Sequence, residues 1–258
     1  MHKLVLLMTI ASLFWIPCLA QSESLSVDGQ SQSAVTHPSI DPSVEADRLF
    51  SHGEDPERDR QVLVTLERAL VTDANNYQWL WRVARLCYHV GNGAGVDEKQ
   101  PYFERGIEVG QRAIAQQPTG VEGHFWLGAN YGGLSAIQNK LKALLMVPKV
   151  RAEMDMALRL QASYENGGAY RALGEMDRQL PGVFGGSLRR AITYLEQGVR
   201  VAPQNIAMKL ALAKAYRDAH QHNESQQQLV EILQIPVRPD RVRADSAIQE
   251  QARQLLGQ

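Results

Sequence analysis

Few residues in this sequence have the types and spacing that metal binding or phosphate binding requires. His220 and His222 are the nearest approach to a metal-binding pair, but residues two apart diverge on a helix, and the sequence has no Cys or His cluster to complete the site. The glycine-rich run 91–95 lacks the Gly-Lys-Ser/Thr of a phosphate-binding loop and follows a predicted helix instead of a strand. We interpret this run as a turn between two helices.

A catalytic nucleophile or acid–base pair is equally hard to place. Cys87 lies on the apolar helical row Leu80, Val83, Cys87 and Val90, where a cysteine acts as a small packing residue. Ser187 opens a predicted helix with no strand before it, unlike the serine of a nucleophile elbow. For the carboxylates of Glu153 and Asp155, or Glu165 and Glu175, the sequence indicates no apolar pocket that would set up acid–base chemistry. We therefore predict no catalytic residues, no metal site, no cofactor and no enzymatic activity.

Arginine and aromatic side chains are better candidates, for recognition of another molecule. They fall on the predicted first helices of successive helix pairs, which usually line the concave face of a stacked array. The candidates for a partner-binding surface are Arg82, Arg85, Tyr88, His89, His124, Tyr131, Tyr170, Arg171 and Arg178. The alternative is that this face is solvated or occupied by local salt bridges.

The segment from Leu141 to Val150 is unusually apolar for an insertion between helices. Such a segment is unfavourable when fully exposed. One interpretation is that it folds back over the helices, with Pro148 opening the next helix. The other is that Leu144, Leu145, Met146 and Val147 line an apolar cavity or a protein contact.

The elements that would position these residues are helices. From about Val44 onward apolar residues recur with helical spacing, and no sustained strand alternation occurs. Val62, Leu66 and Leu70 form one stripe, and a later stripe begins after Ser187, a good helix N-cap.

The helices also repeat along the chain. Small residues near helix ends, Ala69, Ala113, Ala157 and Gly198, lie 44, 44 and 41 positions apart. A small residue in each unit allows close helix crossing, and similarity at a fixed period is typical of a helical solenoid.

The repeated motifs resemble those of tetratricopeptide repeats. The units are carried by Trp81, Ala84 and Tyr88, by Trp126-Leu127-Gly128 with Tyr131, by Tyr170 with Ala172-Leu173-Gly174, and by Leu212-Ala213 with Tyr216. We predict an all-α, tetratricopeptide-like solenoid of about five helix pairs plus a C-terminal helix. The middle units are longer than the usual repeat, and we place their extra residues between paired helices, at 90–104, 132–148 and 179–187.

A longer series of motifs resembles the TRAP-transporter T-component family of bacterial periplasmic repeat proteins. The motifs are Trp126-Leu127-Gly128, then residues 147–150, 157–160, 163–174, 180–187 and 202–205. The resemblance implies an all-helical scaffold that forms a homo-oligomer and associates with a substrate-binding component of a transporter. Members of that family are often lipid-anchored, whereas the residues before Cys18 form a poor lipobox.

The N-terminus has the pattern of an export signal. A positive start at His2 and Lys3 precedes an apolar run of ~13 residues, shorter than the ~20 of a membrane-spanning helix. We predict a signal peptide over 1–20, a flexible linker over 21–43 and a helical-repeat domain over 44–258, with the mature protein in the periplasm. A lipid anchor at Cys18 and an uncleaved membrane anchor are the alternatives, but Trp15-Ile16-Pro17 before the cysteine is a poor lipobox.

Composition narrows the choice of partner. The 258 residues carry a net charge of -1, with no basic excess that would favour nucleic acid. We predict a non-catalytic exported scaffold that binds a periplasmic protein as an accessory component of a TRAP-type transport system. The alternative is a periplasmic carrier for an apolar small molecule.

Overall fold

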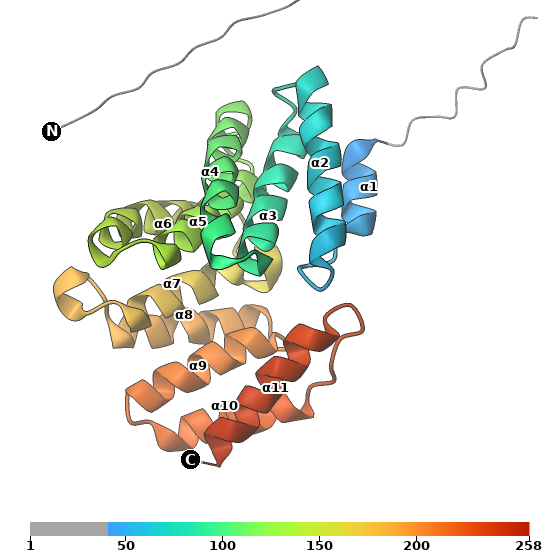
Figure 1. The fold of residues 1–258 in the computed structure, drawn as a ribbon. Helices are drawn as coiled ribbons and strands as arrows, with labels where there is room; N and C mark the ends of the chain where they lie inside the picture. Colours follow the sequence, from blue (N-terminus) through green and yellow to red (C-terminus); the bar gives the residue numbers. More distant parts are fainter. Residues whose placement is uncertain (1–40, 258) are drawn as a thin grey trace, which may run out of the picture. The chain divides into compact units, whose positions relative to one another are not determined.

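A computed structural model describes residues 41–257 of the chain. These residues form eleven α-helices joined by short connections (Figure 1). They are α1 (Pro42–Leu49), α2 (Pro56–Thr72), α3 (Tyr77–Gly93), α4 (Lys99–Gln116), α5 (Val121–Ile137), α6 (Lys140–Gln161), α7 (Gly168–Gln179), α8 (Leu188–Val201), α9 (Ile206–Asp218), α10 (His222–Gln234) and α11 (Val242–Leu256). Three short 3-10 turns, Val96–Glu98, Tyr164–Asn166 and Gly182–Phe184, join some of them. The predicted signal peptide and nearly all of the predicted linker lie outside the described residues.

Consecutive helices pack as pairs, α1 with α2 through α9 with α10, and α11 packs on α10 and α9. Each pair also packs on the next, through contacts such as α4 on α5 and α8 on α9. The predicted five pairs plus a C-terminal helix are confirmed. No helix within residues 41–257 combines the length and apolar character needed to cross a membrane.

Side-chain caps begin several of these helices. Asp55, Asn76, Asn139, Ser187 and Asn205 each accept a hydrogen bond from a backbone N–H in the first turn of the following helix. Such a bond satisfies one of the N–H groups that a helix start leaves without a partner. The prediction of Ser187 as an N-cap is confirmed, since its Oγ lies 3.3 Å from the backbone nitrogen of Arg190.

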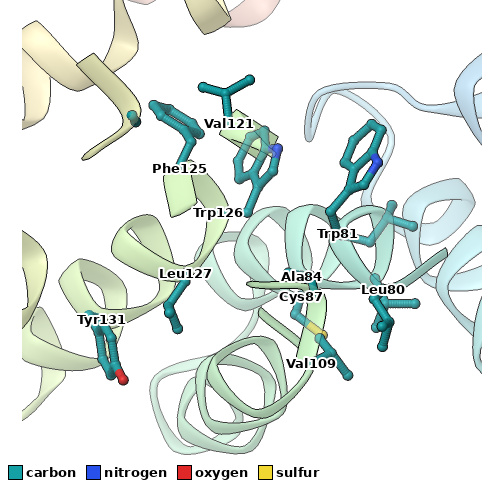
Figure 2. Packing of buried hydrophobic residues seen from close by; sticks show 14 of the residues in the cluster. Leu80, Trp81, Ala84, Cys87, Val109, Val121, Phe125, Trp126, Leu127 and Tyr131 are labelled. Atoms are coloured by element: carbon teal, nitrogen blue, oxygen red, sulfur yellow. The ribbon is translucent and has the colours of Figure 1, made fainter. Parts of the chain in front are cut away.

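The core runs through the helix pairs. Figure 2 shows Trp81, Ala84 and Cys87 on α3, with Cys87 next to Val109 of α4, and Phe125, Trp126 and Leu127 on the neighbouring α5. Cys87 is fully buried, which confirms its packing role, and burial raises the pKa of its thiol far above the usual range. A helix that is apolar on two sides, as α3 is, must be covered twice, and α2, α4 and α5 cover it.

Two of the three predicted insertions are wrong in position. Residues 132–148 are helical except for a two-residue break at 138–139, so Pro148 lies inside α6 and does not open it. Residues 90–104 likewise belong mostly to α3 and α4, because the extra residues lengthen both helices of the pair. The third insertion, 179–187, does lie mainly in a loop around Gly182–Phe184.

Close helix crossing explains two glycine positions. A Cβ on Gly106 of α4 would overlap Oδ1 of Asn130, a fully buried side chain of α5. The Nδ2 of Asn130 donates to the carbonyl oxygens of Ala84, at 2.9 Å, and Trp126, at 2.7 Å, and so ties α5 to α3. At Gly198, one of the predicted repeat positions, a Cβ would overlap the sulfur of Met208 from α9. The small residue there permits close crossing, as the sequence predicts.

Candidate functional site

A cavity of about 610 Å³ lies along the first helices of successive pairs. Its walls come from α3, α5, α6, α7 and the start of α9, and from the segment that leads into α11. Such a volume is within the range of small-molecule sites in proteins. The cavity is therefore the candidate functional site.

Four predicted site residues line this cavity. Tyr88, His89 and Arg171 reach it from α3 and α7, and Val147 reaches it from α6. Their neighbours around the cavity include Trp126 of α5, whose ring centre lies 5.5 Å from that of His89. Three of the recognition residues predicted on first helices therefore lie around one cavity.

The other predicted recognition residues bind groups elsewhere in the protein. Arg82 and Arg85 both bind the carboxylate of Asp47 on α1, and Arg85 also stacks 4.0 Å from the ring centre of Phe50. Arg178 lies 2.7 Å from Asp218 of α9. These three arginines hold helices together, which is the salt-bridged alternative considered for this face.

The remaining polar candidates are also used internally. His124 lies between Glu153, at 2.7 Å from Nδ1, and the carbonyl oxygen of Pro118, at 2.9 Å from Nε2. The Tyr131 hydroxyl accepts a hydrogen bond from Nε2 of Gln111. Tyr170 packs with the core cluster around Leu195 and Met208.

The apolar segment 141–150 is part of α6, so its side chains point into different surroundings. Val147 lines the cavity, Met146 packs on the core, and Leu145 is 64% exposed. Leu144 is half-buried. Successive residues on a helix point about 100° apart, so four neighbours cannot share one surface.

Sequence reasoning missed several polar residues of the cavity. Glu165 and Glu175 line it, although the sequence indicated no pocket for them, and His52, Asn166 and Arg241 line it as well. Arg241 comes from a connecting segment with no helical period of its own, so only the fold brings it here. The one usable signal was Asn166-Gly167-Gly168, whose residue types favour the left-handed backbone of a tight turn.

The two histidines beside the cavity are held in the neutral form. Burial lowers the pKa of His89 to about 3, and the nearby His52, Arg85 and Arg241 add to the shift. Burial also lowers the pKa of His52, again with help from Arg241 and Arg85. At neutral pH both rings therefore contribute aromatic surface and hydrogen-bonding groups without charge.

Glu165 and Arg241 have shifted pKa values as well. Burial raises the pKa of Glu165, although Arg85 and Arg241 oppose the shift. Burial lowers the pKa of Arg241, and the positive charge of Arg238 adds to this shift. Perturbed titratable groups that converge on one cavity are typical of functional sites.

The cavity holds no arrangement of a nucleophile and base among the described residues. Ser135 lines it, but its hydroxyl donates to the carbonyl oxygen of Ala143. Within residues 41–257 no group of three or more His, Cys, Asp or Glu side chains is placed to hold a metal ion. The groups present are suited to binding through aromatic faces, hydrogen bonds and charge.

Solved structures similar to this one include tetratricopeptide-repeat proteins. TTC0263 of Thermus thermophilus, described as a thermophilic TPR protein, matches with a TM-score of 0.63 at 17% identity, over 84% of this chain and 98% of that one. MamA matches with a TM-score of 0.50 at 15% identity, over 83% of this chain and 98% of that one. These similarities show a tetratricopeptide-like fold, as the motifs predict.

Sequence comparison gives a family. No curated protein matches the chain. The model of the family described as "Regulator of microtubule dynamics protein 1-3" matches residues 43–174, slightly more than half of the 258 residues and α1 through most of α7. This match differs from the TRAP-transporter family that the motifs resemble, and that resemblance stays a prediction. The chain belongs to the regulator of microtubule dynamics protein 1-3 family.

Proposed function

We propose that this protein is a non-catalytic scaffold that binds an extended segment of a partner protein along the first helices of its pairs. The observation that carries the proposal is the cavity of about 610 Å³ on that face, bordered by Tyr88, Trp126 and Arg171. Aromatic and arginine side chains dominate the energetics of protein recognition. The tetratricopeptide-like fold supports the proposal, because stacked helix pairs provide a long continuous surface.

Arg171 is the residue of this face best placed to meet a partner. Its side chain is 43% exposed, and its contact with Glu175 is a loose one of 3.7 Å. An exposed ion pair of this kind contributes little to stability. Arg171 can therefore turn to a carboxylate of the partner at little cost to the fold.

The finer part of the proposal concerns location and partner. We propose export through the signal peptide over residues 1–20, homo-oligomerisation, and docking to the substrate-binding component of a TRAP-type transporter. The resemblance of residues 126–128, 147–150, 163–174 and 180–187 to the T-component family supports this partner. The apolar run after Lys3 supports export.

A crosslinking pull-down from native envelope tests the proposal. The wild type should retain a transporter substrate-binding component, and Arg171→Glu should lose it while its circular dichroism stays helical. Arg189→Glu, the same charge change at an exposed position of α8, is the matched control and should retain the partner. Equal retention by the two variants would contradict docking through the cavity face.

The same bait reports on export. Mass spectrometry of its N-terminal peptide should show a start at Gln21 after cleavage. A start at an acylated Cys18 would mean a lipid anchor, and an uncleaved N-terminus would contradict the signal peptide.

A second candidate function is a carrier for an apolar small molecule. It is favoured by the apolar part of the cavity wall, where Val147, Val150 and Met154 of α6 face the site. It predicts a lipid or other apolar compound that co-purifies with the wild type and is lost in Val147→Asp. Organic extraction followed by mass spectrometry would detect it, and extracts without any such compound would remove this candidate.

A further inference from the structure

The turn between α6 and α7 has an unusual backbone at the cavity wall. Glu165 and Asn166 have positive φ angles, 48° and 53°, and Gly167 follows with 73°. Residues other than glycine rarely adopt this left-handed region, because a Cβ atom makes it sterically strained. The surrounding structure must therefore hold the turn in place.

Two hydrogen bonds from other helices hold this turn. Nε1 of Trp126 donates to the hydroxyl of Tyr164 at 2.9 Å, and Nδ2 of Asn205, the N-cap of α9, donates to the carbonyl oxygen of Asn166 at 3.0 Å. The Tyr164 ring also packs against Phe125, with ring centres 5.3 Å apart. The consequence of this fixed turn is that Glu165 lines the cavity.

The carboxylate of Glu165 has no partner among the residues that the structure describes. No hydrogen bond and no ion pair within 4.0 Å joins it to another side chain of residues 41–257. A carboxylate that is partly removed from water without such a partner is costly. The unpartnered carboxylate therefore lies on a residue whose backbone is also strained.

Arg241 is a positively charged group of the same cavity that, like Glu165, has no ion-pair partner among the described residues. It lines the same cavity from the segment that leads into α11, and its Nε is buried without a hydrogen-bond acceptor. The nearby Arg238 differs, because Asp245 binds it at 2.7 Å. Within the described part of the chain Arg241 has no carboxylate within ion-pair distance, so it keeps an unmatched guanidinium beside the cavity.

The two unmatched charges influence each other without touching. The field of Arg241 acts on Glu165, yet the pair is farther apart than the 4.0 Å of an ion pair. Neutral histidines and aromatic rings, His52, His89 and Trp126, line the same cavity. A ligand with one charge would leave the other group of the protein unmatched, and an uncharged ligand would leave both.

We propose that the cavity binds a small zwitterion of the amino-acid or short-peptide type, with its carboxylate on Arg241 and its ammonium on Glu165. A bidentate guanidinium–carboxylate contact and a carboxylate–ammonium contact are the strong, charge-assisted pairings of each group. The aromatic rings provide surface for the uncharged part of the ligand. This inference goes beyond the partner docking proposed above and does not rest on it, because Arg171 is not part of the pairing.

Titration of purified full-length protein with trialanine and with each free amino acid, followed by calorimetry, tests the inference. At least one of these zwitterions should bind, and its N-acetylated and C-amidated forms should bind about tenfold to a hundredfold more weakly. Binding of trialanine alone would identify a peptide site, and binding of a free amino acid would identify an amino-acid site. Absence of binding by the whole set, or equal binding of the blocked forms, would overturn the proposal.

Matched variants locate the site. Glu165→Gln and Arg241→Met should each weaken binding by about tenfold or more, since each removes one charged contact. Glu104→Gln and Arg253→Met make the same changes at exposed positions and should bind as the wild type does. Unchanged affinity in the cavity variants would place the ligand elsewhere and overturn the assignment. Partner retention by Glu165→Gln in the pull-down separates this inference from the docking proposal.

Discussion

At the scale of single residues, the two histidines of the cavity, His52 and His89, are held in their neutral forms by burial. His89 lies among Phe50, Tyr88 and Trp126, with its ring centre 4.9, 5.4 and 5.5 Å from theirs. Besides burial, the titratable groups that lower its pKa are His52, Arg85 and Arg241, and all three disfavour its protonation. The imidazole therefore behaves as an aromatic packing residue at neutral pH.

The lowered pKa of His89 predicts that the folded protein loses stability in mild acid. Its pKa falls from 6.5 to about 3 on folding, so the unfolded chain binds a proton that the folded chain excludes. Stability is fully present above about pH 6.5 and decreases as the pH falls below it, by about 2 kcal/mol at pH 5. Glu165, with a raised pKa, acts in the opposite direction, since its folded form takes up a proton first.

Urea unfolding between pH 7 and pH 5 measures this effect. We expect the free energy of unfolding of the wild type to decrease more over this range than that of His89→Phe, which cannot titrate at this position. His222→Phe removes an exposed histidine and leaves the cavity unchanged, so it is the control. Parallel pH profiles for the wild type and His89→Phe would contradict the buried neutral state.

At the scale of helices, two helices can approach closely where one of them has a glycine, which has no side chain, at the crossing. Gly106 of α4 faces the amide of Asn130, and this amide also bonds to α3. A methyl group at position 106 would displace the amide from the carbonyl oxygen that it binds. Gly132 on α5 is different, because a Cβ there would meet nothing within 4 Å.

These two glycines predict opposite effects of the same substitution. Gly106→Ala should reduce the free energy of unfolding by about 1–3 kcal/mol, as overpacking of a filled core does. Gly132→Ala should increase it by about 0.4–1 kcal/mol, because alanine restricts the unfolded chain and favours the helix. Urea unfolding of the two variants provides the comparison, and equal effects would mean that the junction at Gly106 is not closely packed.

At the scale of the whole described chain, residues far apart in the sequence close the cavity face. The carboxylate of Glu54, from the loop before α2, accepts hydrogen bonds from the backbone nitrogens of Arg243, at 3.2 Å, and Ala244, at 3.0 Å. These nitrogens are in the first turn of α11, where no side chain of α11's own N-cap residue serves as a cap. Glu54 thus caps the last helix from the other end of the repeat array and keeps the segment containing Arg241 in place.

This long-range cap predicts a local effect on α11. Glu54→Ala should cost about 0.5–2 kcal/mol, the usual loss for an N-cap, and most of it should fall on α11. Hydrogen exchange should become faster over residues 242–256 and remain unchanged over α5. Glu57→Ala removes an exposed carboxylate on α2 and is the control. If hydrogen exchange over α11 were equally fast in Glu54→Ala and Glu57→Ala, Glu54 would not stabilise this helix.

Local patterns in the sequence were sufficient to predict the helices, their pairing and the repeat. Apolar stripes such as Val62, Leu66 and Leu70, and caps such as Ser187, depend on neighbours within a few turns, so their consequences can be read locally. The same local reasoning assigned Cys87 to the core. It misplaced the start of α6, because a proline inside a helix looks like a helix start when only its neighbours are considered.

The polar residues that meet in the cavity could not be predicted from local patterns, because long-range packing brings them together. Arg85 and Arg171 both look like recognition residues in the sequence, but Arg85 is fixed to Asp47, whereas Arg171 faces the cavity. Glu165 and Arg241 are separated by two helix pairs, α7 with α8 and α9 with α10, and no periodicity relates them. Their presence in one cavity results from the stacking of α7, α9 and α11, since long-range packing, unlike helix formation, has no local signature in the sequence.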